Sequence, residues 1–239
     1  MAKRGKVTIK VEPRELVERP VRSRKYQYLM LIVCEVQNTE RVYFVQFNRL
    51  FNALLPNETV YLKDVGTGRN SLGVVMQAIA EREILATESG KKVDEVWAIF
   101  DKDDLDKIPK TRENFEQAFS KAGEEHIRIA YSNECFELWL LLHFRNVNAD
   151  ETLPRTTLYE RLAAAVNKHD KAFVYHHGSA DVLAEVQKYG NEQKAIERAM
   201  ALDIYHTNNN HSPIEANPRT LVYQLVEQLR QWYAFYSYK

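Results

Sequence analysis

The sequence has few of the residues that define disulfide-rich, secreted or membrane proteins. Its 239 residues include two cysteines, and Cys34 and Cys135 each lie inside an apolar run without a CxxC motif or a Cys/His cluster. This favours reduced thiols in a core over a disulfide framework or a metal site. There is no run of about 18 apolar residues, and the N-terminus lacks the apolar core of a signal peptide. We therefore expect a cytoplasmic protein with no membrane contact.

An excess of charge of one sign is also missing from the chain as a whole. It has 33 basic and 33 acidic residues, so net charge gives no argument for a nucleic-acid partner. Residues 1–25 are the exception, with nine lysine or arginine residues against three glutamates. This segment is predicted to be a basic N-terminal arm, either solvated or in contact with phosphates.

Apolar runs of strand length alternate with segments of helical periodicity in the first part of the chain. Strands are predicted at residues 26–35, 59–65, 93–100 and 127–133, and helices at 38–55, 74–87 and 111–123. The run "CFELWLLLHF" fits a strand or a helix, and helical spacing of its large side chains, with Ser132 and Asn133 as caps, favours a helix. The alternation predicts an α/β fold with a Rossmann-like, largely parallel sheet flanked by helices.

Only helical patterns follow residue 146. They cover residues 156–169, 179–189, 192–203 and 218–236, the last with Asn217 as N-cap and Pro218 as its first residue. The predicted organisation is therefore the arm at 1–25, an α/β domain at 26–146, and a C-terminal helical region at 147–239 packed on that domain.

Two of the predicted strands end in carboxylates. Glu35 follows the first strand, and Asp101 and Asp103 follow the strand in "VWAIFDKDDLD". Parallel strands end at one edge of a sheet, and a spacing of two places both aspartates on one side. Converging carboxylates suit Mg²⁺ or Mn²⁺, which can polarise a phosphodiester and lower the pKa of a bound water. Solvated turn residues are the alternative, because a DxD motif is short.

Other polar residues in the predicted α/β domain offer contacts to a substrate. Arg69 and Asn70 lie in "GTGRNSLG", between a strand and a helix, but the segment lacks the ending of a nucleotide-binding P-loop. They are predicted to contact a nucleic-acid backbone, with a plain turn as the alternative. Lys102 is a further candidate for electrostatic positioning of the strand.

The run "CFELWLLLHF" carries two more candidates. Glu137 would supply another metal ligand, and His143 a proton-transfer or phosphate contact, if they face the acidic edge. Each is otherwise a hydrogen-bonded structural group. Asn133 either caps this helix or reaches the same site.

The paired histidines later in the chain are weak evidence for zinc. They are His176 with His177 and His206 with His211, and neither pair has acidic or cysteine partners at metal-ligand spacing. Structural or surface roles are favoured for both pairs. The polar segment 205–211 is a candidate for RNA contact, and "WYAFYSY" at the end of the chain either stacks on bases or packs on the body.

Several motifs in fixed order resemble a known family. "VCE…TE…YF", "GTGRNSL", "DEVWAIFDKDD", "SNECFELWLLLHF" and "NPRTLVYQLVEQL" resemble the RloB-like family of phage-defence proteins, which share the toprim domain. The resemblance covers residues 26–232. It implies that Glu35 is the motif glutamate and that Asp101 and Asp103 are the metal-binding pair.

The match departs from the family pattern beside that glutamate. Where relatives have "CEGE-TE", this chain has Val36 and Gln37, while Glu40 remains as a candidate metal ligand. The resemblance implies a Mg²⁺-dependent nuclease of abortive-infection defence, working with an ABC- or AAA-type ATPase partner. RNA such as tRNA is slightly preferred over DNA as its target. A toprim module that binds nucleic acid or the partner without cleavage is the alternative; a primase-like transferase ranks lower, and a homo-oligomer is left open.

Overall fold

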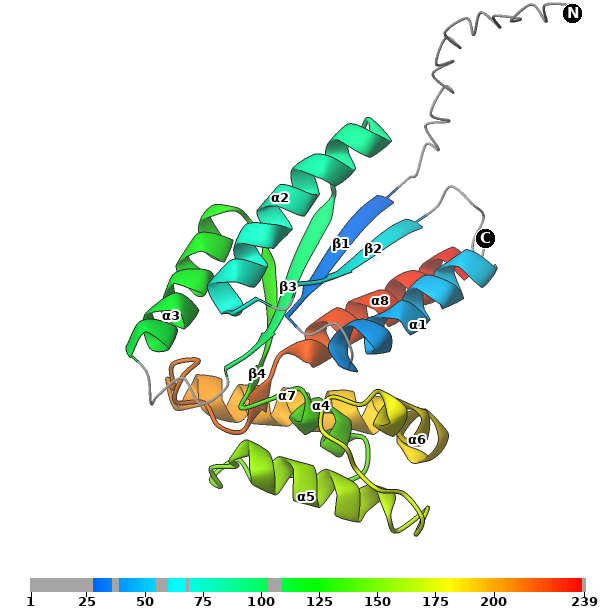
Figure 1. Cartoon of the computed structure of the whole chain (residues 1–239), viewed down its shortest axis with the longest axis vertical. Coiled ribbons are helices and arrows are strands. Elements are labelled where there is room, and N and C mark those ends of the chain that lie inside the picture. The colour runs from blue at the N-terminus through cyan, green and yellow to red at the C-terminus, as the bar shows by residue number, and fades with distance from the viewer. Residues whose placement is uncertain (1–27, 36–38, 55–59, 68, 103–108, 238–239) are drawn as a thin grey trace, which may run out of the picture.

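The computed structural model describes residues 28–35, 39–54, 60–67, 69–102 and 109–237 of the chain (Figure 1). The predicted basic arm at 1–25 lies outside these residues, as do Val36, Gln37 and Asp103. Within the described ranges, no helix has the length and apolar character needed to cross a bilayer.

The centre of the molecule is a five-stranded sheet with the order β2-β1-β3-β4-β5. Four strands run parallel, and the short fifth pairs antiparallel with β4. The strands are β1 (Tyr28–Cys34), β2 (Val60–Gly66), β3 (Glu95–Asp101), β4 (Arg128–Asn133) and β5 (Arg219–Thr220). The predicted α/β fold with a largely parallel sheet is confirmed.

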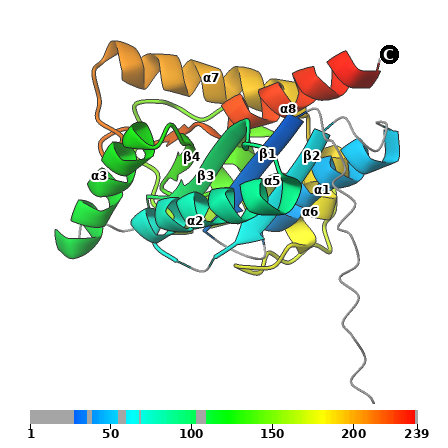
Figure 2. The same ribbon diagram turned by 90° about the horizontal axis from the view of Figure 1, so that it is seen from above.

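Eight helices are described, and they cover both faces of this sheet (Figures 1 and 2). They are α1 (Thr39–Leu54), α2 (Ser71–Ser89), α3 (Pro109–Glu124), α4 (Glu137–Leu142), α5 (Arg155–Val166), α6 (Asp181–Tyr189), α7 (Glu192–Asn208) and α8 (Val222–Ser237).

Burial of β1 on both faces explains its unbroken apolar sequence. Leu29, Leu31 and Val33 belong to a core shared with α2 and α3, whereas Met30 and Ile32 belong to a core shared with α1, α4 and α8. Successive residues of a strand point to opposite faces, so both sets must be apolar. Figure 2 shows α2 on one side of the sheet and α7 and α8 on the other. The second core also includes α5 and α6, so the C-terminal helices pack continuously with the sheet.

The predicted start of the last helix is wrong. Residues Arg219–Thr220 form β5, and α8 begins only at Val222. The reason is tertiary: Thr220 and Arg219 pair with Ser132 and Asn133 at the open edge of β4, which requires extended backbone. Asn217 does not cap a helix, and its Oδ1 instead accepts the amide of Leu153 at 2.8 Å.

The predicted caps of the helix after β4 are also wrong. Ser132 and Asn133 belong to β4, and α4 has Phe136 at its N-cap with no side-chain cap hydrogen bond. The Ser132 hydroxyl hydrogen-bonds Thr220 Oγ1 at 2.9 Å, so pairing with β5 replaces capping. The expectation of reduced core thiols is confirmed, because Cys34 and Cys135 are buried and form no disulfide bond.

Candidate functional site

Glu35 and Asp101 meet at the edge of the sheet where the parallel strands end, here called the carboxyl edge. Strands β1 and β3 are neighbours, and the Glu35 amide continues their ladder by donating to the Ile99 carbonyl at 2.9 Å. The Asp101 amide in turn donates to Glu35 Oε2 at 3.0 Å. The parallel register therefore brings Glu35 and Asp101, which are 66 positions apart in the sequence, into contact through a backbone amide.

The start of α4 closes over this pair. The Phe136 amide donates to Asp101 Oδ2 at 3.2 Å, so a helix N-terminus faces the aspartate. Amides at a helix N-terminus favour nearby negative charge. Glu137, the next residue, is the first of α4, and its side chain is only 7% exposed. Glu137 therefore directly follows the residue whose amide contacts Asp101, and its predicted role as a metal ligand remains a prediction.

Glu137 is held by residues of the segment between α5 and α6. The Tyr175 hydroxyl donates to Glu137 Oε1 at 2.7 Å, and His177 Nδ1 lies 3.8 Å from the same oxygen. Burial, followed by the charges of Glu137 and Asp101, raises the pKa of the Cys135 thiol well above its usual value. The two carboxylates therefore act on one buried thiol, which stays neutral.

Helix α5 adds a positive charge and an aromatic ring to this region. Its first residue is fixed by Glu134, whose Oε2 accepts the Arg155 amide at 2.7 Å. Burial and the charges of Glu137 and Asp101 raise the pKa of Tyr159, while the Arg155 guanidinium acts in the opposite direction. Sequence patterns gave no sign of Arg155, Tyr159 or Tyr175 as site residues, because they reach this region only through the packing of α5 and of the segment between α5 and α6.

Three rings form a contiguous set, here called the ring stack: Tyr175, Tyr159 and His177. The ring centroids of Tyr159 and Tyr175 are 5.4 Å apart, and those of Tyr159 and His177 are 4.9 Å apart with an interplanar angle of 30°. The ring stack is linked to the carboxyl edge through Glu137.

His143 does not lie with this group. It is the C-cap of α4, at the opposite end from Phe136, and its Nδ1 is 2.9 Å from the Trp139 carbonyl. Its ring packs against Trp139 and Tyr43. Burial lowers the pKa of His143 to about 4, so the ring is neutral at ordinary pH. These contacts support a role for His143 as a hydrogen-bonded structural group.

Asn133 has structural contacts as well. It is fully buried at the end of β4, and its Nδ2 donates to the carbonyls of Pro213 and Ile214 at 3.0 Å each. These bonds fasten the segment after α7 to the sheet. The described contacts of Asn133 are thus within the protein, and its predicted substrate role remains a prediction.

The remaining candidates of the α/β domain are Asn70, Arg69, Glu40 and Lys102. Asn70 caps α2, with its Oδ1 accepting the Gly73 amide at 2.9 Å, and Arg69 beside it is exposed. Glu40 is buried in the first turn of α1, and Lys102 is buried directly after β3, where its amide donates to the Ser132 carbonyl at 2.9 Å. Asn70 thus caps a helix and Arg69 is exposed, and the substrate contacts predicted for both remain predictions.

The predicted metal set is incomplete in the described structure because Asp103 lies outside it. Within the described ranges, no group of three or more histidine, cysteine, aspartate or glutamate side chains is arranged to hold a metal ion. The set of Glu35, Asp101 and Asp103 therefore stays a prediction.

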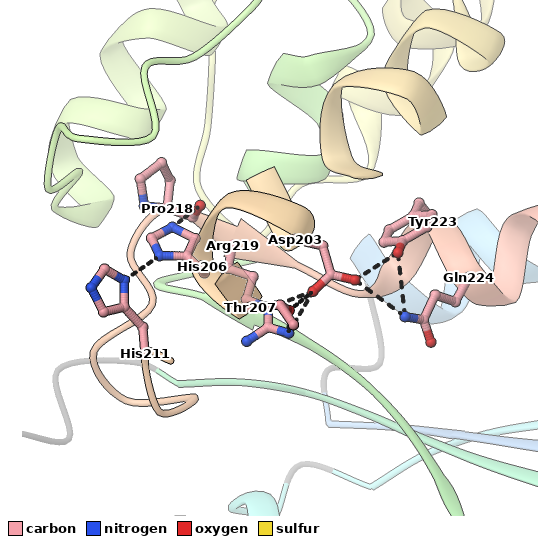
Figure 3. Close-up of polar contacts among 8 residues, drawn as sticks. All are labelled: Asp203, His206, Thr207, His211, Pro218, Arg219, Tyr223 and Gln224. Atoms are coloured by element: carbon pink, nitrogen blue, oxygen red, sulfur yellow. Dashed lines mark hydrogen bonds and ion pairs between the residues drawn. The ribbon is translucent and has the colours of Figure 1, made fainter. Parts of the chain in front are cut away.

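A second polar cluster links α7, β5 and α8 (Figure 3). Asp203 Oδ1 accepts from Arg219 Nε at 2.8 Å, and its Oδ2 accepts from the Tyr223 hydroxyl at 2.6 Å. Beside it, His206 Nε2 lies 3.0 Å from the Pro218 carbonyl, and its Nδ1 lies 2.9 Å from His211 Nδ1. The carbonyl requires Nε2 to carry a proton, so His206 serves as a hydrogen-bonding bridge, in line with the favoured structural role.

The fold and the carboxyl edge define an α/β protein with acidic residues at the ends of parallel strands. A family model, described as RloB-like protein, matches residues 30–229. The chain belongs to this family, and the matched residues include Glu35, Asp101, Glu137 and the ring stack. No curated protein and no solved structure shows a significant match to the chain.

Proposed function

We propose that this protein is a metal-dependent nuclease that cleaves phosphodiester bonds of nucleic acid, with RNA such as tRNA slightly preferred over DNA. The observation that carries the proposal is the contact between Glu35 and Asp101 at the carboxyl edge. In open α/β sheets, ligands bind at this edge. We further propose that the nuclease is an effector of antiphage defence and works with an ATPase partner, as the RloB-like resemblance implies.

The two carboxylates fit a Mg²⁺ or Mn²⁺ ion by their chemistry. Both supply hard oxygen ligands, and each is held by a backbone amide through one of its oxygens, Oε2 of Glu35 and Oδ2 of Asp101. A bound divalent ion would polarise the phosphodiester and lower the pKa of an attacking water. Asp103 is the proposed third ligand, and Glu40 and Glu137 are candidates for a further one.

The protein's own groups provide the fixed surroundings of that chemistry. Glu35 is anchored on β3 by the Asp101 amide, so its carboxylate cannot turn away without loss of a hydrogen bond. The N-terminus of α4 faces Asp101 and favours negative charge there. Arg155 brings a positive charge to the same region, suited to a substrate phosphate.

A module that binds nucleic acid or the partner ATPase without cleavage is the second candidate. It rests on Val36 and Gln37, which replace the glycine and the acidic residue of the family pattern directly after Glu35. Such a protein would keep the fold and the carboxyl edge but lack turnover.

The effect of divalent ions on thermal stability tests whether the carboxyl edge binds a metal. A ligand that binds only the folded state raises the unfolding free energy, by about 2.7 kcal/mol at a concentration 100 times its Kd. We expect Mg²⁺ or Mn²⁺ to raise the Tm of the native chain and not that of Asp101→Ala/Asp103→Ala. The matched control is Asp94→Asn, because Asp94 precedes the opposite end of β3 and binds the Leu29 amide and Lys91.

Cleavage of tRNA, single-stranded RNA and plasmid DNA then tests the nuclease itself. The native chain and Asp94→Asn should cut one of these substrates with Mg²⁺ or Mn²⁺ present. Asp101→Asn should lose more than about a hundredfold in rate, because loss of an outer-shell partner of a metal already costs up to about that much. Equal cleavage by the native chain and Asp101→Asn would refute the proposed role of the aspartate. Metal binding without cleavage of any substrate would favour the binding module.

A further inference from the structure

The ring of His177 combines high exposure to solvent with a fixed aromatic contact. Its side chain is 63% exposed, yet its ring is stacked on Tyr159. One face of the imidazole is therefore covered by an aromatic side chain that is itself half-buried, while much of the ring remains open to solvent. An exposed ring held in this way is preorganised for a planar ligand.

The backbone also fixes the position of this ring. The Ser179 amide donates to the His176 carbonyl at 3.1 Å, which closes a turn around His177 and Gly178. Gly178 has φ of +76°, a conformation that side chains rarely adopt. The Ser179 hydroxyl then accepts the Asp181 amide at 3.1 Å at the start of α6. The turn presents His177 from a segment tied at both ends.

The same segment is tied to the carboxyl edge. Tyr175, two residues before His177, donates its hydroxyl to Glu137, and the residue before Glu137 donates its amide to Asp101. The charges of both carboxylates also contribute to the raised pKa of Tyr159, after burial. The ring stack is thus a neighbour of the proposed metal site.

We infer that the ring stack of Tyr175, Tyr159 and His177 is a binding platform for an unpaired nucleobase next to the phosphate at the carboxyl edge. Aromatic and histidine rings stack on bases that are splayed out of a helix, and a base paired within a duplex does not offer its face in this way. The substrate class is therefore single-stranded or looped nucleic acid. This inference rests on the proposed function for the identity of the neighbouring phosphate.

The first test measures binding with the probe kept intact. The probe is a fluorescein-labelled single-stranded RNA of about 12 nucleotides, within the usual range of single-strand sites. A DNA strand of the same sequence and a hairpin duplex are compared with it by anisotropy, with EDTA present. His177→Ala should weaken single-strand binding about tenfold, as expected for loss of one stacking ring. His177→Phe should restore binding because it keeps a ring.

His176→Ala is the matched control. His176 is the exposed neighbour of His177 in the same turn, and its substitution should leave binding within about twofold of the native value. Equal binding by His177→Ala and His176→Ala would overturn the inference. So would preferential binding of the hairpin, or a failure of the native chain to bind any of the probes.

A spectroscopic signature separates stacking from a merely structural role. A single strand that carries 2-aminopurine should lose fluorescence when it binds the native chain or His177→Phe. It should keep its fluorescence when it is bound at a saturating concentration of His177→Ala. Unchanged quenching by His177→Ala would also overturn the inference. Thermal unfolding of the variants checks that the surface substitutions leave the fold intact.

The outcomes distinguish this inference from the nuclease proposal. If the native chain cleaves RNA while His177→Ala binds as the native chain does, the base platform is refuted and the nuclease stands. If binding and quenching depend on His177 but the native chain cleaves no substrate with Mg²⁺ or Mn²⁺, the nuclease is refuted and the platform stands.

Discussion

The surroundings of Asp203 and those of Asp101 differ in the kind of group that meets the carboxylate. Asp203, within the helical layer, is met by side chains: the Arg219 guanidinium on one oxygen and the Tyr223 hydroxyl on the other (Figure 3). At the carboxyl edge, the Asp101 side chain accepts the Phe136 amide, and its own amide binds Glu35.

This difference bears on what each region can do. A guanidinium and a hydroxyl that come from β5 and α8 tie those elements to α7, so the Asp203 cluster serves the fold. At the carboxyl edge, a backbone amide binds one oxygen of Glu35 and another binds one oxygen of Asp101, and a divalent cation is the ligand that we propose for this pair. We therefore expect the Asp203 cluster to contribute more to stability, and the carboxyl edge to provide the proposed binding site. Each prediction below changes one side of this comparison.

The largest expected effect is on the Asp203 side. Arg219→Ala leaves a mostly buried carboxylate without its cation, which typically costs about 3 to 5 kcal/mol. Asp101→Asn keeps an oxygen to accept the Phe136 amide, so its cost should stay below about 1 kcal/mol. Urea unfolding of both variants measures the difference. Comparable losses would mean that Asp101 is as much a structural group as Asp203.

The next prediction concerns pH and the buried His143 at the far end of α4. Its pKa in the fold is about 4, below the value of about 6.5 in an unfolded chain. Above pH 6.5 both states are neutral at this group, and its contribution to stability is complete. As pH falls from 6.5 to 4, only the unfolded chain gains the proton, so stability should fall by roughly 3 kcal/mol.

His143→Asn isolates this contribution, because its side-chain amide can still donate to the Trp139 carbonyl. The unfolding free energy of the native chain should drop more than that of the variant between pH 7.5 and pH 4.5. If both drop equally, the pKa of His143 is not lowered by the fold, and the alternative role of His143 in proton transfer gains support.

Two tyrosines provide a paired test of intermediate size. Tyr223 donates to Asp203 and Tyr175 donates to Glu137, so each Tyr→Phe change removes a hydrogen bond to a carboxylate, worth about 1.5 to 3 kcal/mol. Both should lower stability in urea. Only Tyr175→Phe should also weaken single-strand binding, since it loosens the segment that presents His177. Loss of binding in Tyr223→Phe at full folding would contradict the separation of the two regions.

Much of the fold was accessible from sequence because periodicity reports burial directly. The apolar run of β1 and the acidic ends of β1 and β3 predicted a parallel sheet with carboxylates at one edge, and Glu35 and Asp101 do meet there. The start of the last helix was predicted wrongly because residues 219–220 pair with the edge of β4, and no local sequence pattern indicates this pairing.

The rest of the candidate site was inaccessible for a similar reason. Tyr159 and Tyr175 reach Glu137 through the packing of α5 and the segment after it, and tyrosine is too common in this chain to mark a site. His177 was grouped with His176 by adjacency, and only the structure separates the stacked ring from its neighbour. Residue type and spacing predict what strands bring together, but contacts between the sheet and the helical layer depend on the tertiary fold.

The smallest expected effect comes from the segment before α2, where Asn70 and Arg69 were both predicted to contact substrate. Asn70→Ala removes the acceptor of the Gly73 amide and should cost about 1 kcal/mol, whereas Asn70→Ser retains a cap and should cost little. Arg69→Ala changes an exposed residue and should leave stability within about 0.5 kcal/mol of the native value. If Arg69 contacts a phosphate, its loss reduces both the affinity for single-stranded RNA and the dependence of that affinity on salt, since one fewer counterion is released on binding. Titrations of the RNA at two salt concentrations, with Asn70→Ser as the control, therefore show whether residues 69–70 extend the binding surface of the carboxyl edge. Equal salt dependence of binding in Arg69→Ala and Asn70→Ser would mean that these residues only start α2.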